Sequence, residues 1–326
     1  MDIRSLKECL GQDWTAVQER IVSALESDIS LLNLTNSSIL SQSGKQLRPM
    51  LALMMARACA GKATDGSIRY AAAAELLHNA TLLHDDVADG SELRRGKPTI
   101  MSLMGPAVSV LVGDYWLVKA MELILCDSEN DTKAIRIFSK TLSDLAEGEM
   151  LQLQKAQSGD TVEDDYLRII YNKTASLFEA ACVTAALSVD ASDEYMQAAK
   201  DYAVALGLAF QIKDDILDYD GTISVGKPLG VDILEQKITM PLLGALNNVS
   251  EQHQAKVRAM IKDIVGKPEL RDEIVEFVKQ NGGLDYAISR LDEYIETAVR
   301  ALDALPASLE KDYLVELAHY TAKRDK

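Results

Sequence analysis

The chain has 326 residues, of which 48% are hydrophobic and only 5% aromatic, so it can bury a large core and favours helices over sheets. Its formal net charge of -16 argues against a nucleic-acid-binding protein, which would carry a basic stripe. No stretch of about 18 apolar residues predicts a membrane span, and no apolar N-terminal stretch suggests a signal peptide. The four cysteines have no metal-type spacing, so we expect reduced core thiols in a cytoplasmic protein.

The first part of the chain predicts two helices separated by a polar connection. Apolar residues recur at helical spacing from about 13 to 33, and the Asn- and Ser-rich stretch 33–44 is typical of a connection. An apolar helix follows at about 50–60. Lys45 and Arg48 precede it, three residues apart, so both cations could face the same side, although ordinary surface positions explain them as well.

A long predicted helix at about 67–89 ends in three aspartates, Asp85, Asp86 and Asp89. Positions i, i+1 and i+4 fall within one narrow arc of a helix, so the three carboxylates share a face. Gly90 then marks the helix end, where the partial negative charge of the backbone disfavours acids by roughly 0.3 to 1 kcal/mol each. The arrangement therefore indicates a bound cation.

Basic residues accompany this first acidic cluster. Arg94, Arg95 and Lys97 follow it in a predicted loop, and the planar fork of arginine suits phosphate oxygens. Neutralisation of the aspartates explains the loop almost as well. His78 lies two turns before Asp85 on nearly the same face, where a lone histidine is more often a structural residue than a ligand.

The middle of the chain predicts further helices at about 107–126, 131–157 and 161–189. Lys173 and Thr174 lie in the middle of the last of them. A cation and a hydroxyl at such positions are usually explained by the solvated surface of a helix, so they do not by themselves indicate a site.

A helix at about 194–219 carries Gln211 and ends in a second copy of the acidic pattern, Asp214, Asp215 and Asp218. One such cluster is explained about equally well by a solvated helix end. Two copies, each after an apolar run and each at a helix end, favour a divalent metal site. Oxygen ligands without Cys or His partners suit magnesium, whose coordination is usually completed by water and substrate phosphates.

The rest of the chain completes a helical protein. A glycine-flanked loop at 226–232 contains Lys227, and Lys237 leads into the next helix. Residues from about 250 to 326 predict amphipathic helices without a chemical motif, for which we expect packing and subunit contacts. Because neither strand-type alternation nor a linker divides the chain, we expect an all-α fold and a single domain, residues 1–326, that brings both acidic clusters to one mouth of a helix bundle.

Together these motifs closely resemble those of the trans-type polyprenyl diphosphate synthases. The likeness runs from about residue 43 to 241 in the order and spacing of that family, with one departure, since Ser43 stands where the family often has a first glycine before Lys45. It implies an all-helical domain around a deep central cavity, a homodimer, and a prenyltransferase activity that uses three magnesium ions.

The resemblance also implies roles for individual residues. The metal ions would be bound by Asp85, Asp89 and Asp214, supported directly or through water by Asp86, Asp215 and Asp218. The allylic diphosphate would be held by Arg94, Lys173, Gln211, Lys227 and Lys237. Isopentenyl diphosphate would be held by Lys45, Arg48, His78 and Arg95.

The chemistry of that reaction agrees with such a set of residues. Breaking an allylic carbon–oxygen bond leaves a carbocation and concentrates negative charge on diphosphate, so catalysis requires cations fixed around the leaving group. The double bond of isopentenyl diphosphate, held close, then attacks the carbocation. We expect the released diphosphate to take the proton that is lost, because no side chain is an obvious base. Thr174 and Gln211 could offer oxygen dipoles to the carbocation, and an apolar pocket would exclude water.

Small residues before the first cluster predict a long product. In the resembled family the residues five and four before the first aspartate form the floor of the product tunnel, and here they are Ala80 and Thr81. The small residues 71–74 continue this track to 85 - 71 = 14 residues before Asp85, roughly 21 Å of helix, and Phe138 is a candidate for its end. We expect a heptaprenyl to nonaprenyl product for a quinone side chain, made from farnesyl or geranylgeranyl diphosphate, with transient membrane-surface contact on release.

Three alternatives remain open. A geranylgeranyl or farnesyl diphosphate synthase would perform the same chemistry and stop earlier. A class I terpene cyclase has a related fold but usually lacks the second acidic pattern and the cations Lys45, Arg48 and Arg95. A catalytically silent partner subunit would tend to lose its acidic clusters, whereas this chain keeps all six aspartates.

Overall fold

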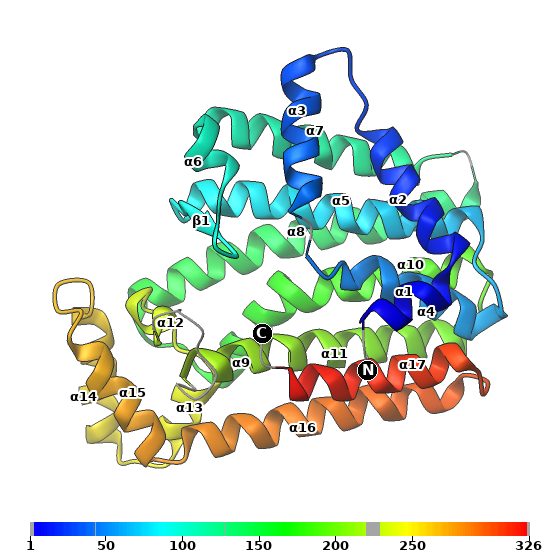
Figure 1. The fold of residues 1–326 in the computed structure, drawn as a ribbon. Coiled ribbons are helices and arrows are strands. Elements are labelled where there is room, and N and C mark those ends of the chain that lie inside the picture. The colour runs from blue at the N-terminus through cyan, green and yellow to red at the C-terminus, as the bar shows by residue number, and fades with distance from the viewer. Residues whose placement is uncertain (1–2, 43, 127, 220–228, 325–326) are drawn as a thin grey trace. The chain divides into compact units, whose positions relative to one another are not determined.

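The computed structural model describes residues 3–42, 44–126, 128–219 and 229–324, and its regular structure is almost entirely helical (Figure 1). Within these ranges the strands are limited to β1 (Leu93–Arg94) and β2 (Lys97–Pro98), which pair antiparallel. The all-α prediction is therefore confirmed. Ser43 and Lys227, both named from the sequence, lie outside the described residues.

The chain forms two compact units. Unit 1 comprises Met1–Ser139, Ala180–Lys200 and Ala304–Leu314. Unit 2 comprises Lys140–Glu179, Asp201–Asp303 and Val315–Lys326. Five elements have residues in both units: α8 (Glu129–Ser158), α10 (Ser176–Ser188), α11 (Asp193–Tyr219), η2 (Leu302–Ala304) and α17 (Leu309–Lys323). The expectation of a single domain stays a prediction.

Unit 1 is built around one long helix. Its other complete helices are α1 (Ile3–Leu10), α2 (Gln12–Ala24), α3 (Ser30–Ser41), α4 (Leu47–Ala60), α6 (Ile100–Met104) and α7 (Pro106–Ile124). The central helix α5 (Asp65–Ala88) packs against α7, α4 and α2 (Figure 1). Its residues 71–74 are four fully buried alanines, whose small side chains let the neighbouring helices approach closely.

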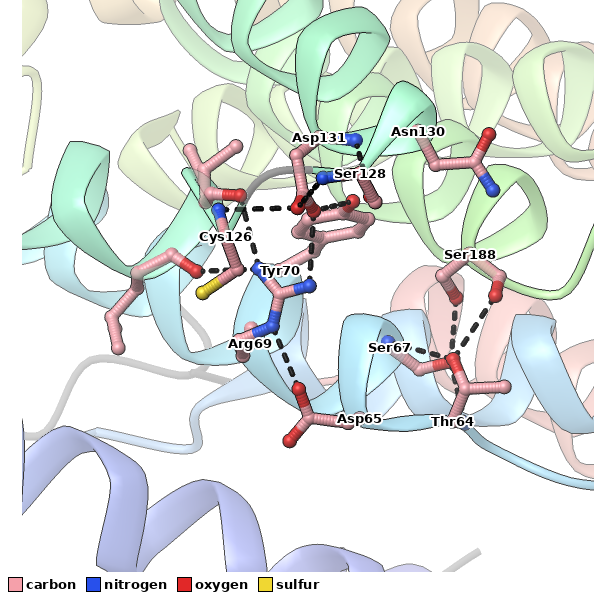
Figure 2. A network of polar contacts seen from close by, with 12 residues as sticks. Thr64, Asp65, Ser67, Arg69, Tyr70, Cys126, Ser128, Asn130, Asp131 and Ser188 are labelled. Carbon is pink, nitrogen blue, oxygen red and sulfur yellow. Dashed lines mark hydrogen bonds and ion pairs between the residues drawn. The ribbon is translucent and has the colours of Figure 1, made fainter.

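A network of polar contacts anchors the start of α5, two residues earlier than predicted (Figure 2). Thr64 caps the helix by accepting a hydrogen bond from the backbone N–H of Ser67. Arg69 and Tyr70 both reach Asp131 at the start of α8, at 2.9 and 2.5 Å. These contacts fix the end of α5 that lies farthest from the acidic cluster.

The predicted connection at 33–44 is wrong over most of its length, because residues 30–41 form α3. Its polar residues have partners that the sequence does not reveal. The buried Asn36 side chain donates to the backbone carbonyl of Leu25 at 2.9 Å and accepts a hydrogen bond from Trp116 Nε1 at 2.8 Å. The break between helices falls earlier, where the backbone N–H of Ser27 donates to the Asn33 side chain.

Unit 2 consists of the second half of α8, parts of α10, α11 and α17, and several complete helices. These are α9 (Glu163–Ile170), the π-helical turn η1 (Tyr171–Ala175), α12 (Val231–Leu234), α13 (Met240–Asn247), α14 (Glu251–Asp263), α15 (Leu270–Gln280) and α16 (Gly283–Ala301). The buried helix α13 packs along α16 (Figure 1). Within the described parts of the chain no helix is both long and apolar enough to cross a membrane.

The single helix predicted at 161–189 is wrong in one detail, because η1 interrupts it. Gly207 on α11 explains part of this geometry. A Cβ atom there would lie 2.5 Å from the Cα atom of Ala175, so only glycine allows α11 to approach the π-turn so closely. Single π-turns of this kind occur frequently at functional sites, and this one carries Lys173 and Thr174.

The cysteines match the prediction only in part. All four are free thiols. Cys182 is buried and Cys9 and Cys59 are half-buried, but Cys126 is exposed rather than in the core, because it lies in the connection between α7 and α8.

Candidate active site

The first acidic cluster lies at the C-terminal end of α5, as predicted. Asp86 is buried, and its Oδ1 atom accepts a hydrogen bond from Nε of Arg94 at 2.8 Å. Asp85 is half-buried, and Asp89, the first residue after the helix, is exposed. Gly90 follows with a φ of +62°, the left-handed conformation that ends many helices. Two of the three carboxylates are therefore accessible, whereas the middle one holds an arginine.

A tight hairpin brings the two predicted arginines back to the end of α5. Its turn residues, Arg95 and Gly96, have φ angles of +54° and +75°, which suits the two-residue turns that join antiparallel strands. Thr99 closes the loop, because its backbone N–H donates to the carbonyl oxygen of Glu92 at 3.0 Å. Arg94 is thereby placed against Asp86.

The hairpin also meets the segment before α4. A Cβ atom on Gly44 would lie 2.0 Å from the guanidinium of Arg95, so the two residues are in close contact and a larger side chain at position 44 would require the Arg95 side chain to move. Lys45 follows directly, and Arg48 is half-buried in the first turn of α4. Unit 1 therefore brings together the cations that the sequence assigned to isopentenyl diphosphate.

His78 and Glu75 lie among these cations. Burial lowers the pKa of His78 well below its ordinary value, and repulsion from Arg48 lowers it further, so the imidazole is neutral. Burial lowers the pKa of Arg48 to about 10, which leaves it charged at neutral pH. Glu75, which the sequence did not single out, is buried beside Arg48, and burial raises its pKa. Asn79 donates to Oε1 of Glu75 at 3.2 Å.

Unit 2 contains a cavity of about 140 Å³ with a mixed polar and apolar lining. It contains three residues predicted to hold the allylic diphosphate, namely Lys173, Gln211 and Lys237. Asp215 of the second cluster also lines it. So do three residues that the sequence did not indicate, Lys155, Tyr166 and Asp232. A cavity with several cations and acids is suited to bind a charged ligand.

A chain of hydrogen bonds runs along one wall of this cavity. The hydroxyl of Tyr166 donates to Oδ2 of the buried Asp215 at 2.6 Å. Gln211 Nε2 donates to Oδ1 of the same carboxylate at 3.0 Å, and Gln211 Oε1 accepts from the Thr174 hydroxyl at 2.9 Å. The amide orientation follows from this chain, because a carboxylate accepts and a hydroxyl can donate. Lys173, next to Thr174, pairs with Glu149.

The last aspartate of the second cluster is turned towards backbone. The two carboxylate oxygens of Asp218 accept hydrogen bonds from the N–H groups of Val231 and Asp232, at 3.1 Å each, at the start of α12. Burial raises the pKa of Asp232 to about 6. Lys237 lies 3.9 Å from the Asp232 carboxylate. Asp232 is thus a fourth acid beside the second cluster. It lies on α12, outside the aspartate motif, so the motif does not reveal it.

The first aspartate of the second cluster has a partner from the end of the chain. Oδ1 of Asp214 lies 2.8 Å from a terminal nitrogen of Arg324, and the Asp214 side chain is 43% exposed. No sequence motif marks Arg324, which lies 324 - 214 = 110 residues after Asp214.

The residues predicted to set product length lie in unit 1. Ala80 is buried in α5, and Phe138 is fully buried in α8. The Thr81 hydroxyl donates to the backbone carbonyl of His78 at 2.8 Å, so the methyl group is the part of this side chain that is left for other contacts. Their roles stay predictions.

Comparisons with known proteins give a consistent family. The polyprenyl synthetase family model matches residues 30–278. The chain is 37% identical to the octaprenyl diphosphate synthase of Escherichia coli (strain K12), with 100% of both chains covered. A crystal structure of a decaprenyl diphosphate synthase from Rhodobacter capsulatus matches with a TM-score of 0.91 and 35% identity over 100% of both chains. A polyprenyl synthase from Caulobacter crescentus CB15, complexed with calcium and isoprenyl diphosphate, matches with a TM-score of 0.88 and 35% identity over 100% of this chain and 98% of that one. The chain belongs to the polyprenyl synthetase family.

Proposed function

We propose that this enzyme is an all-trans polyprenyl diphosphate synthase that adds isopentenyl units to an allylic diphosphate such as farnesyl or geranylgeranyl diphosphate. The observation that carries the proposal is the full-length similarity to an octaprenyl diphosphate synthase, joined to the presence of two aspartate clusters and a set of cations. The proposed product is a long chain of heptaprenyl to nonaprenyl length that supplies a quinone side chain.

The cations of unit 1 suit isopentenyl diphosphate. Arg48 and Arg95 lie near each other and near His78, whose neutral imidazole can donate one hydrogen bond without adding charge. Lys45 adjoins them through Gly44. We propose that these four residues hold the diphosphate of isopentenyl diphosphate and orient its double bond.

The cavity of unit 2 suits the allylic diphosphate. Lys173 and Lys237 line it, and we assign them, with Gln211, to that substrate. Arg94 and Lys227 complete the proposed set, of which Lys227 lies outside the described residues. Because the Gln211 carbonyl accepts from Thr174, the oxygen of Thr174 is the group better placed to offer a dipole to the carbocation. Water exclusion by the apolar surroundings would prolong the life of that cation.

Divalent metal ions are the proposed cofactor. Among the described residues no three His, Cys, Asp or Glu side chains converge as a preformed metal-binding group. Magnesium needs few protein ligands, since it keeps several waters and is completed by phosphates. The accessible carboxylates of Asp85, Asp89 and Asp214 fit this demand, and we propose that they hold three Mg²⁺ ions. Bound there, the ions would offset the charge that develops on the leaving diphosphate.

The other three aspartates are proposed to support the first three. Asp86 holds Arg94, Asp215 holds Tyr166 and Gln211, and Asp218 holds the start of α12, so each has protein partners for its carboxylate.

A homodimer is proposed from exposed apolar side chains of unit 1. Large apolar side chains are exposed on α7 and on two helices that contact it, α3 and α6: Leu34 on α3, Leu103 on α6 and Leu111 on α7 have exposed fractions of 69%, 59% and 68%. Grouped exposure of this kind marks interaction surfaces. We commit to a second copy as the occupant, because the family resemblance implies a homodimer. Transient contact with a membrane surface is proposed only for release of the apolar product.

One incubation tests the activity. Purified protein would be mixed with isopentenyl diphosphate, farnesyl diphosphate and Mg²⁺, and the extracted lipid analysed by mass. We expect products of about 35 to 45 carbons, because the residues five and four before Asp85, Ala80 and Thr81, are both small. Products of 15 or 20 carbons would instead assign a short-chain synthase, and absence of diphosphate release would support a silent partner subunit.

A substitution tests the length assignment. Ala80→Phe places a large ring at the proposed floor of the tunnel, so we expect the product to shorten to about 15 or 20 carbons. Ala80→Ser is the matched control, since it keeps the side chain small and should keep the long product. An unchanged product from Ala80→Phe would remove Ala80 from the tunnel.

A further inference from the structure

Arg324 is a buried arginine held at three points by one turn of α11. It follows α17 directly, and its side chain is only 5% exposed. A terminal guanidinium nitrogen donates to the backbone carbonyl of Phe210 at 2.8 Å and lies 2.8 Å from Oδ1 of Asp214. The guanidinium carbon also lies 3.9 Å from the centroid of the Phe210 ring. All three residues belong to unit 2.

Two of these three contacts do not involve Asp214. The Phe210 ring packs against Phe178 at a centroid distance of 5.7 Å, so the surface on which Arg324 stacks is itself fixed. The backbone N–H of Arg324 donates to the carbonyl oxygen of Tyr320 at 2.9 Å. The guanidinium is therefore held in place without the help of Asp214, and it can hold the Asp214 carboxylate in one orientation.

The Asp214 side chain needs a contact that fixes its orientation. Asp214 adjoins Asp215 in the second acidic cluster, so another carboxylate lies close to it. Its side chain is 43% exposed, so packing alone does not restrict its rotamers. Because Arg324 engages Oδ1, the other carboxylate oxygen can face a ligand on the exposed side.

We propose that Arg324 is a positioning residue that orients Asp214 for a divalent cation. This rests on the proposed function, in which Asp214 binds one of the Mg²⁺ ions. A positive charge so close to a metal ligand would weaken metal binding if it merely competed for the carboxylate. The independent anchors on Phe210 favour the other outcome, in which Arg324 stays in place and pre-orients the ligand.

The test uses Arg324→Met and Arg324→Lys in the full chain. Binding of Mg²⁺ with inorganic pyrophosphate is measured by calorimetry, and the Mg²⁺ dependence of turnover is measured in parallel. Arg324→Met should weaken Mg²⁺ binding about tenfold, as loss of a ligand-orienting partner commonly does. The KM for isopentenyl diphosphate should stay within about twofold, because its proposed site lies on other residues. Arg324→Lys should rescue part of the loss.

Two controls make the result specific. Arg258 also donates to two backbone carbonyls in unit 2, those of Gly159 and Thr161, so Arg258→Met should leave the Mg²⁺ dependence unchanged. In an Asp214→Asn background, Arg324→Met should add little further loss, since the two residues act as one unit. Unchanged or tighter Mg²⁺ binding by Arg324→Met overturns the proposal. If the natural chain shows no prenyl transfer, the proposed function fails, while the calorimetry still reports on Arg324.

Discussion

The two acidic clusters have the same spacing in the sequence but different surroundings in the protein. In unit 1 the middle aspartate, Asp86, binds a charged partner, Arg94, whereas in unit 2 Asp215 binds the neutral donors Tyr166 and Gln211. Asp89 ends its cluster as an exposed residue, but the carboxylate of Asp218 is engaged by backbone amides. Equal motifs therefore do not imply equal ligands, because the chain that follows each helix decides which oxygens stay accessible.

The electrostatic balance of the two sites also differs. In unit 1, burial and then repulsion from Arg48 lower the pKa of His78 and keep it neutral, while burial lowers the pKa of Arg48 to about 10. In unit 2, burial raises the pKa of Asp232 to about 6, and the cavity beside it is lined by lysines as well as aspartates. Unit 1 thus suits an anion, and unit 2 suits an anion that brings positive charge with it.

The largest expected effect comes from an accessible aspartate. Asp85→Ala should lower turnover by about 10²- to 10³-fold, because it removes a group that fixes positive charge at the leaving diphosphate. Helicity should be intact, since the side chain is only half-buried. Diphosphate release under saturating substrates is the measurement, with circular dichroism as the control. Near-normal turnover would contradict the metal-binding role of Asp85. The two clusters would then share a sequence pattern but not a role in metal binding.

A second substitution concerns Asp218, whose contacts differ most from those of its counterpart in the first cluster, Asp89. Asp218→Ala removes the acceptor of two backbone N–H groups, so the free energy of unfolding should fall by about 1 to 2 kcal/mol. Hydrogen exchange at the amides of Val231 and Asp232 should speed up. The matched variant Asp89→Ala should not lower the free energy of unfolding, because Asp89 is exposed at a helix end that disfavours acids. If Asp218→Ala and Asp89→Ala lost the same free energy of unfolding, the proposed difference between these two aspartates would be wrong.

Much of this arrangement is readable from the sequence, and the remainder depends on tertiary contacts. The period of apolar residues predicts α4, α5, α8 and α11, and glycine marks the end of α5. The same reasoning misplaced the connection before α4, because the sequence pattern does not reveal that the side chain of Asn36 in α3 accepts a hydrogen bond from the distant Trp116.

The site divides in the same way. The aspartates and the cations near them are visible as local motifs. Arg324 and Asp232 are not, because each reaches its cluster from a distant or separate element, and neither has a spacing that marks it. The π-turn at Lys173 is invisible for a similar reason, since it depends on the approach of Gly207.

Glycine contacts provide a third comparison of the units. A Cβ atom at Gly207 meets the backbone of Ala175 in unit 2, whereas one at Gly113 in unit 1 meets the His84 ring, a side chain that can move. Gly207→Ala should therefore cost about 1 kcal/mol of unfolding free energy even after the gain in helix propensity. It should also lower turnover by shifting Lys173. Gly113→Ala should be tolerated better in a thermal unfolding experiment. A greater loss from Gly113→Ala would contradict the argument.

The smallest expected effect concerns pH and distinguishes the cationic site of unit 1. Because the pKa of folded His78 lies well below its ordinary value near 6.5, both folded and unfolded chains are neutral there above that pH. As the pH falls below 6.5, the unfolded chain takes up a proton that the folded chain does not, so His78 lowers the free energy of unfolding. His78→Gln removes this term, and between pH 7.5 and 5.5 the variant should lose less stability than the natural chain, by a few tenths to about 1 kcal/mol. Denaturant titrations at both pH values measure the difference. If the two proteins lose stability in parallel, burial in unit 1 does not hold His78 neutral.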